Sequence, residues 1–173
     1  LALTGGDLGI LANEVEKFAL FLNATPEAPR RLERAHLAQL GADSAEEDVN
    51  ALVSAIVTGD RRGLERQMQL LEGSSAIPAL RALARRLLQL AEARAMVDAG
   101  RKPAEAIAAL RPPVFWKERE TMARALQQWP HRRIQAGLDA CLAGERAIKT
   151  PGGPKDVAGW QAIVALGAPA ERS

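Results

Sequence analysis

The sequence contains few aromatic residues: three phenylalanines, three tryptophans and no tyrosine. It also lacks any sustained alternation of β-branched or aromatic side chains with polar ones, the pattern typical of β-strands. No apolar run approaches the roughly 18 residues that a membrane-spanning helix needs, and no signal-peptide pattern is present. These absences argue against sheet-based folds and membrane proteins, and they predict an all-α chain.

Cysteine is almost absent as well, since Cys141 is the only one in 173 residues. A single thiol excludes an intramolecular disulfide, and the two histidines, His36 and His131, lie too far apart for a zinc-ligand spacing. We therefore predict no metal site. The lack of disulfides favours a reducing, cytoplasmic location.

Motifs for catalysis and cofactor binding are missing too. The chain has neither the GxxxxGK[ST] phosphate loop nor the GxGxxG dinucleotide motif, and it has no HExxH or GxSxG pattern. We predict no catalytic residues and no cofactor. The composition is that of a folded globular protein, and the formal net charge of +2 is too small to indicate a nucleic-acid-binding protein by itself.

The sequence does contain a series of amphipathic helical patterns, separated by capping residues, glycines and prolines. Pro29 is expected to begin a helix that Gly41 ends, and Ser44 with Glu47 resembles a capping box for the next one. Asp60 is placed to cap a further helix. With capping residues included, the predicted helices span residues 7–22, 29–40, 44–58, 60–71, 77–99, 103–110, 114–129, 131–149 and 157–166.

Residues 111–120, RPPVFWKERE, place two of the few aromatic side chains side by side. In a helix that advances about 100° per residue, Phe115 falls on an apolar stripe, so we expect Phe115 in the core. The other members of this stripe are Met122, Leu126 and Trp129.

Trp116 falls at the edge of that stripe, beside Lys117 and Arg119. Three interpretations remain open for this tryptophan. It packs as a boundary residue on a neighbouring helix, it anchors a subunit interface, or it stacks on a nucleobase while Lys117 and Arg119 approach phosphates.

Glu145 interrupts the apolar stripe of the helix predicted over 131–149, a stripe that includes Cys141. A carboxylate there is costly unless it is paired, and Lys149 lies one helical turn further on. We predict a structural ion pair of Glu145 with Lys149, or with an arginine from another helix. A catalytic role would need a second acid or base, and the sequence offers none nearby.

Several stretches together resemble the delta subunit of bacterial DNA polymerase III, the clamp-loader subunit. GGDLGILANEVEKFALF is similar to the last helix of the family's lid domain. RRLERAHLAQLGADSAEEDVN resembles the alphaproteobacterial version of the segment that follows. The stretches similar to the collar domain are DVNALVSAIVTGD, AIPALRALARRLLQLAEAR, RPPVFWKERE and GERAIKTPGGP.

The resemblance implies that residues 1–50 are the end of an AAA+ lid-type helical domain and residues 51–173 a helical collar. It implies assembly with gamma/tau and delta-prime subunits, and contact with the sliding clamp only through an N-terminal domain that this sequence lacks. Primer–template DNA would enter the assembly beneath the collar ring, where Trp116 and Lys149 become candidate DNA contacts. The abrupt start of the chain fits the C-terminal part of a longer protein.

Two alternatives stay open at this point. RKPAEAIAAL and VFWKERETMARAL, joined across RPP, could form a stand-alone DNA-binding module of the helix-turn-helix type. Against it, Glu118 and Glu120 alternate with the cations where a recognition helix should be basic. The chain could also be the helical part of an enzyme, which a pocket lined by His131, Cys141 and Glu145 would favour.

Overall fold

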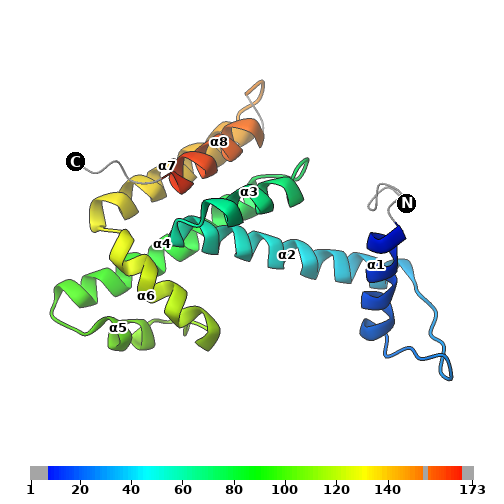
Figure 1. Cartoon of the computed structure of the whole chain (residues 1–173). Helices are drawn as coiled ribbons and strands as arrows, with labels where there is room; N and C mark the ends of the chain where they lie inside the picture. Colours follow the sequence, from blue (N-terminus) through cyan, green and yellow to red (C-terminus); the bar gives the residue numbers. More distant parts are fainter. Residues whose placement is uncertain (1–7, 154–155, 169–173) are drawn as a thin grey trace. The chain divides into compact units, whose positions relative to one another are not determined.

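The computed structural model describes residues 8–153 and 156–168, and Figure 1 shows that they are mostly helical. These residues contain no strand, only an isolated β-bridge between Thr25 and Ala28, so the predicted all-α class is confirmed. None of their helices is both long and apolar enough to cross a bilayer. The helices are α1 (Leu8–Phe21), α2 (Arg34–Thr58), α3 (Arg61–Leu70), α4 (Ile77–Asp98), α5 (Pro103–Ala109), the 3₁₀ helix η1 (Trp116–Glu118), α6 (Arg119–Gln128), α7 (His131–Lys149) and α8 (Asp156–Gly167).

The chain forms two compact units, Leu1–Glu47 and Asp48–Ser173, and the division falls inside α2. The sequence-based domain boundary after residue 50 lies close to this division. All of the buried hydrophobic side chains among the described residues belong to the second unit.

In the first unit, none of the hydrophobic side chains whose burial the structure describes is buried. Along α1, Val15 and Leu20 are exposed. The helix ends at the predicted break, where Asn23 adopts the left-handed conformation with φ +49° that often terminates helices. Asp7, which we expected to cap this helix, lies outside the described residues.

The start of α2 differs from the prediction, because the helix begins at Arg34 and not at Pro29. The Nδ1 atom of His36 accepts a hydrogen bond from the backbone N–H of Glu33 at 3.2 Å. This is one half of a capping box, with His36 in the place of the usual Glu or Gln. The local capping contact therefore starts the helix later than the proline would.

The predicted helix end at Gly41 is also wrong, since α2 continues without interruption through Gly41 and Ser44. A glycine inside a helix costs only about 1 kcal/mol relative to alanine. The surrounding sequence is rich in Ala, Leu, Gln and Glu, which are strong helix formers, and no proline follows to enforce a stop. Ser44 is therefore an interior helical residue and not a cap.

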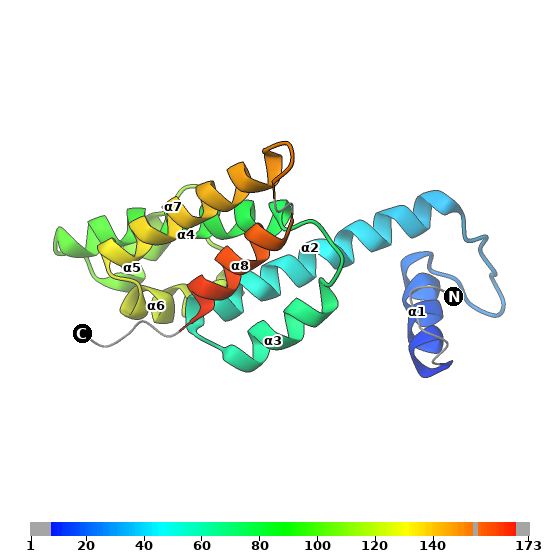
Figure 2. The ribbon, with the colours of Figure 1, turned by 90° about the horizontal axis from the view of Figure 1, so that it is seen from above.

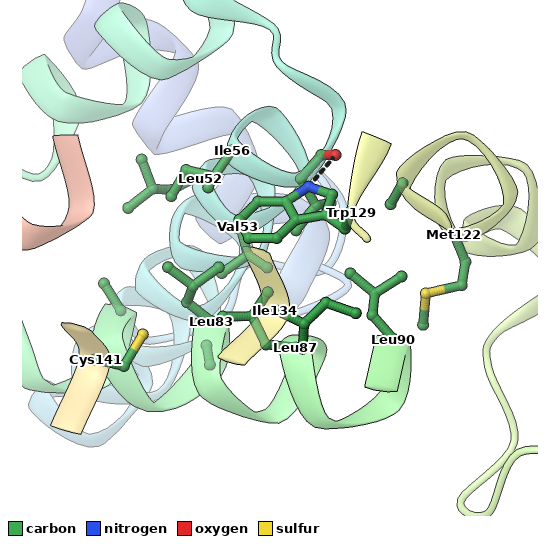
Figure 3. Packing of buried hydrophobic residues seen from close by; sticks show 14 of the residues in the cluster. Leu52, Val53, Ile56, Leu83, Leu87, Leu90, Met122, Trp129, Ile134 and Cys141 are labelled. Atoms are coloured by element: carbon green, nitrogen blue, oxygen red, sulfur yellow. Dashed lines mark hydrogen bonds between the residues drawn. The ribbon is translucent and has the colours of Figure 1, made fainter. Parts of the chain in front are cut away.

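In the second unit, α4 is the central helix and packs against α5, α6, α7 and α8. Figure 3 shows how side chains from α2, α4 and α7 surround the indole of Trp129. Burying one such Leu or Ile side chain stabilises the fold by roughly 1.5–3 kcal/mol. The largest fully buried side chains are Trp129, Leu52, Ile56, Leu80, Leu83, Leu87, Leu90, Leu110, Met122, Ile134, Ile163 and Val57.

Glycine allows α7 to lie close to α4. A Cβ atom added at Gly137 would lie 2.8 Å from Leu87 Cδ1 and 3.3 Å from Trp129 Cζ3, and one at Gly144 would lie 3.2 Å from Leu80 Cδ1. Contacts below about 3 Å would force side chains out of their preferred rotamers. The small residues on α7 thus determine how closely the two longest helices of this unit approach.

Most other helix ends agree with the prediction to within one or two residues. Asp60 caps α3, because its Oδ1 accepts a hydrogen bond from the backbone N–H of Gly63 at 3.0 Å. Asp156, at the start of α8, accepts a hydrogen bond at 2.8 Å from Ala76 N, at the start of α4. A carboxylate is favourable at a helix N-terminus. The contact also joins α4 and α8, two helices that are distant in sequence (Figure 2).

Candidate nucleic-acid contact

The segment between α5 and η1 does not form the helix that we predicted over 114–129. Phe115 is extended, with φ −56° and ψ 139°, and the α-helix begins only at Arg119. The helical wheel that placed Phe115 in the core assumed helical angles at this residue. Because the backbone is extended here, Val114 is buried instead, at 5% exposure, and Phe115 is exposed.

Phe115 and Trp116 form the aromatic patch, a pair of neighbouring rings on the surface. Their exposed fractions are 58% and 66%, and the ring centroids lie 5.8 Å apart with an interplanar angle of 46°. Lys117 Nζ lies 5.4 Å from the centroid of the Trp116 ring, a distance at which a cation is attracted to the ring face. The patch thus presents an apolar, polarisable surface with a positive charge directly beside it.

Glu118 holds this segment on α4. Its Oε2 accepts a hydrogen bond from Arg86 Nη2 at 2.7 Å, and the Arg86 side chain is only 14% exposed. The backbone N–H of Glu118 also donates to the carbonyl of Phe115 at 2.9 Å. The ion pair neutralises one of the two carboxylates near Lys117 and Arg119, so the patch is less acidic than its sequence suggests.

Nothing near Glu118 in the sequence pointed to Arg86, because the two residues lie 32 positions apart. A cation four residues away on the same helix is the only kind of ion-pair partner that local spacing reveals. The partner depends on how α4 packs against η1 and α6, and that packing is visible only in the fold.

Glu145 and Lys149 form the predicted kind of contact, with 2.6 Å between Glu145 Oε1 and Lys149 Nζ. Arg81 from α4 approaches the same oxygen at 2.6 Å. Hydrogen bonds from Arg81 and then Lys149 lower the pKa of Glu145 to about 2, so this carboxylate is ionised at neutral pH. The Glu145 side chain is 21% exposed, and its two cations leave it no free role as an acid or base.

The four candidate DNA contacts do not form one cluster. Trp116, Lys117 and Arg119 are consecutive or nearly so at the start of η1 and α6, whereas Lys149 ends α7 and is held by Glu145. Figure 1 draws the start of α6 and the end of α7 well apart. The candidate site therefore consists of the aromatic patch with Lys117 and Arg119, and Lys149 belongs to a separate ion-pair cluster.

The residues of the alternative enzyme site are not brought together. Cys141 is 3% exposed inside the core, and burial raises the pKa of its thiol to about 11, so it is a poor nucleophile at neutral pH. His131 and Glu145 lie 14 residues apart on α7, about 21 Å along a helix axis. Among the described residues, no group of His, Cys, Asp and Glu side chains is placed to hold a metal ion.

Comparisons with protein-family models, with curated proteins and with solved structures each found no match.

Proposed function

We propose that this chain is the lid and collar part of a clamp-loader delta subunit, of the alphaproteobacterial type. The sequence stretches that resemble the family follow one another in the family's order over nearly the whole chain, and the all-α fold is compatible with a lid followed by a collar. Residues 1–50 would complete the lid, and residues 51–173 would form the collar.

In this role the chain is a scaffold and not a catalyst. Its collar helices assemble with gamma/tau and delta-prime subunits into a pentameric ring, and the sliding clamp is held through the family's N-terminal domain. The assembly loads the clamp on primed DNA. Glu145, with Arg81 and Lys149, then has the structural task of joining α4 to α7.

The observation that carries the proposal is the aromatic patch. It lies in RPPVFWKERE, one of the stretches that resemble the family, and it keeps two aromatic rings in solvent on a backbone fixed by Val114 and by the Arg86–Glu118 ion pair. Exposed aromatic rings beside cations are a typical surface for stacking unpaired bases. We assign Trp116 to nucleobase stacking, with Lys117 and Arg119 near the phosphates.

The geometry gives little support to a helix-turn-helix module. Such a motif joins its two helices by a turn of about three or four residues, whereas residues 110–118 separate α5 from α6 and include η1. Moreover, α6 uses Met122, Ala125 and Leu126 to pack into the core. Strong duplex binding by the chain alone, with a steep salt dependence, would revive this alternative.

The test is assembly. The chain is mixed with candidate gamma/tau and delta-prime subunits, and the complexes are weighed by native mass spectrometry. We expect one copy of the chain in a pentameric complex. The proposal is wrong if the partners assemble among themselves and the chain stays outside the complex, although circular dichroism shows that the chain is folded.

A further inference from the structure

Helix α8 is apolar on two sides. Its inner side carries Gly159, Ile163 and Gly167, which are buried. The outer side carries a second stripe in which Val157 is 60% and Val164 47% exposed. A helix that is apolar all round is normally covered all round. The groove-lining residues of this side recur at three- and four-residue spacing: Val157, Trp160, the polar Gln161, Val164 and Ala165, with Ala168 just beyond the end of the helix.

The outer stripe of α8 forms one wall of a groove whose other wall is α3. The α8 wall contacts α3 at one end of the groove and the turn that follows α3 at the other. At one end the Leu64 side chain lies directly against Gly167, and at the other Trp160 Nε1 donates a hydrogen bond to Ser74 O at 3.3 Å. Two hollows of about 520 and 400 Å³ share Met68 and Val164 as lining residues. We call this continuous surface the α3–α8 groove; Figure 2 shows the ribbons of the two helices after which it is named.

The charges of the groove lie on its α3 side. Glu65, on α3, and Glu72, in the turn that follows α3, both line the groove. Within the described residues neither carboxylate takes part in an ion pair. Arg61 lines the far end, and the lining residues of α8 carry no charge. The groove is thus apolar along α8, and two carboxylates and one guanidinium line its other wall.

We propose that the α3–α8 groove binds an amphipathic helix of a neighbouring clamp-loader subunit, an inference that rests on the proposed function. The bound helix places an apolar stripe on Val157, Trp160 and Val164. It directs Lys or Arg side chains at Glu65 and Glu72. At 1.5 Å per residue the 12 residues of α8 offer about 18 Å of contact, or about three turns.

The chemistry of the groove selects this partner. The seam along α8 has the spacing by which one helix packs against another, and Ala165 and Ala168 are small enough to allow close approach of a second backbone. Two of the three charged lining residues are carboxylates, which favours a basic protein helix over the phosphates of nucleic acid or anionic lipid. Lys or Arg side chains beside the apolar stripe of the partner helix would fix the orientation in which that helix lies in the groove. Opposite charges across an interface determine register more than they add affinity.

The experiment uses the assembly with gamma/tau and delta-prime subunits and a double variant, Val157→Glu with Val164→Glu. Both side chains are exposed in the chain, so the variant is expected to fold, which circular dichroism and thermal unfolding check. We expect at least about tenfold weaker incorporation into the complex, as for loss of an interface anchor. The matched control is Leu88→Glu, at an equally exposed apolar position on α4, which should assemble normally.

A second variant tests the two carboxylates. Glu65→Lys with Glu72→Lys should weaken incorporation at low salt, and the difference from the wild type should shrink at high salt. If the wild-type chain does not assemble at all, the proposed function fails and this partner with it. If the wild type assembles and the valine variant is incorporated equally well, the groove is not the interface. The same conclusion follows if Leu88→Glu lowers incorporation as much as the valine variant does. Self-association of the chain alone that the valine variant abolishes would assign the groove to a second copy and overturn the proposal.

Discussion

Trp116 and Trp129 lie at the two ends of the segment formed by η1 and α6, and their surroundings differ completely. Trp129 is fully buried, and its Nε1 donates a hydrogen bond to Val57 O at 2.9 Å. Trp116 is 66% exposed, and its ring contacts Phe115, which is itself exposed. Both rings have a cation nearby: the Arg133 guanidinium carbon lies 4.1 Å from the Trp129 centroid, and Lys117 Nζ lies 5.4 Å from that of Trp116.

This difference in burial indicates that Trp129 contributes to the stability of the fold, whereas Trp116 is available to bind a partner. At Trp129 the buried ring, the buried hydrogen bond and the desolvated cation all depend on the folded state; burial also lowers the pKa of Arg133. At Trp116 little apolar area is removed from water, so the ring adds little to the stability of the fold. Two tryptophans only 13 positions apart thus support different expectations: one should matter for folding and the other for a partner.

The largest effect is expected for Trp129→Ala. Removing this side chain leaves a cavity between α2, α4 and α7 and should lower the free energy of unfolding by about 3–5 kcal/mol. Urea denaturation followed by circular dichroism measures it. Trp116→Ala is the matched control and should change stability by less than about 0.5 kcal/mol. Comparable losses for the two variants would remove the distinction between the two sites.

A milder change, Trp129→Phe, isolates the hydrogen bond to Val57. The phenyl ring retains most of the apolar contact but leaves the buried carbonyl of Val57 without its donor, at a cost of roughly 1–3 kcal/mol. Trp160→Phe is the control, because its Nε1 donates to an exposed carbonyl, that of Ser74, which water can satisfy. Equal destabilisation by the two substitutions would show that ring volume, and not the buried donor, accounts for the effect at Trp129.

Trp116→Ala tests the other side of the comparison. In the complete clamp loader it should weaken primer–template binding by roughly 1–3 kcal/mol, the range for loss of one base-stacking contact, which is about 5-fold to 150-fold in affinity. Fluorescence anisotropy with labelled primer–template DNA measures the change. Leu88→Ala, another exposed apolar position, is the control.

The outcomes at Trp116 distinguish its three interpretations. Weaker DNA binding with normal assembly supports nucleobase stacking. Loss of assembly would make Trp116 a subunit-interface anchor, and no change in either would leave it a boundary residue on the surface.

The sequence predicted the fold best where helix ends carry strong local signals. Asp60 caps α3, and α7 spans His131–Lys149 as expected. It failed at Gly41, where a glycine without a following proline was too weak a signal to end α2. It failed also at Phe115, because a helical wheel assumes helical angles and one extended residue reverses which side chain is buried.

The candidate site was predictable only in part. Neighbouring residues such as Trp116 and Lys117 are brought together by the sequence itself, and the Glu145–Lys149 pair follows from helical spacing. Arg81 and Arg86 come from α4 and reach their carboxylates only through tertiary packing. One wall of the α3–α8 groove is indicated by the sequence, because α8 has more apolar residues than a single buried side requires. The other wall depends on how α3 packs against α8 and is visible only in the fold.

The smallest expected effect concerns Glu145, which is a surface counterpart to the buried contacts of Trp129. Hydrogen bonds from Arg81 and Lys149 hold the pKa of this carboxyl at about 2, below its ordinary value of 4.5. A carboxyl with a depressed pKa in the folded state adds stability above its unfolded pKa, and this contribution is lost as the pH falls from about 4.5 towards 2. Glu145→Gln should therefore be slightly less stable than the wild type at pH 7, and most of the difference should be lost by pH 2. Urea denaturation across this pH range measures it.

Because Arg81 and Lys149 are more than half exposed, added salt should reduce the difference at pH 7. A difference that persists unchanged at pH 2 would mean that Glu145 stabilises the chain by packing and not by its charge.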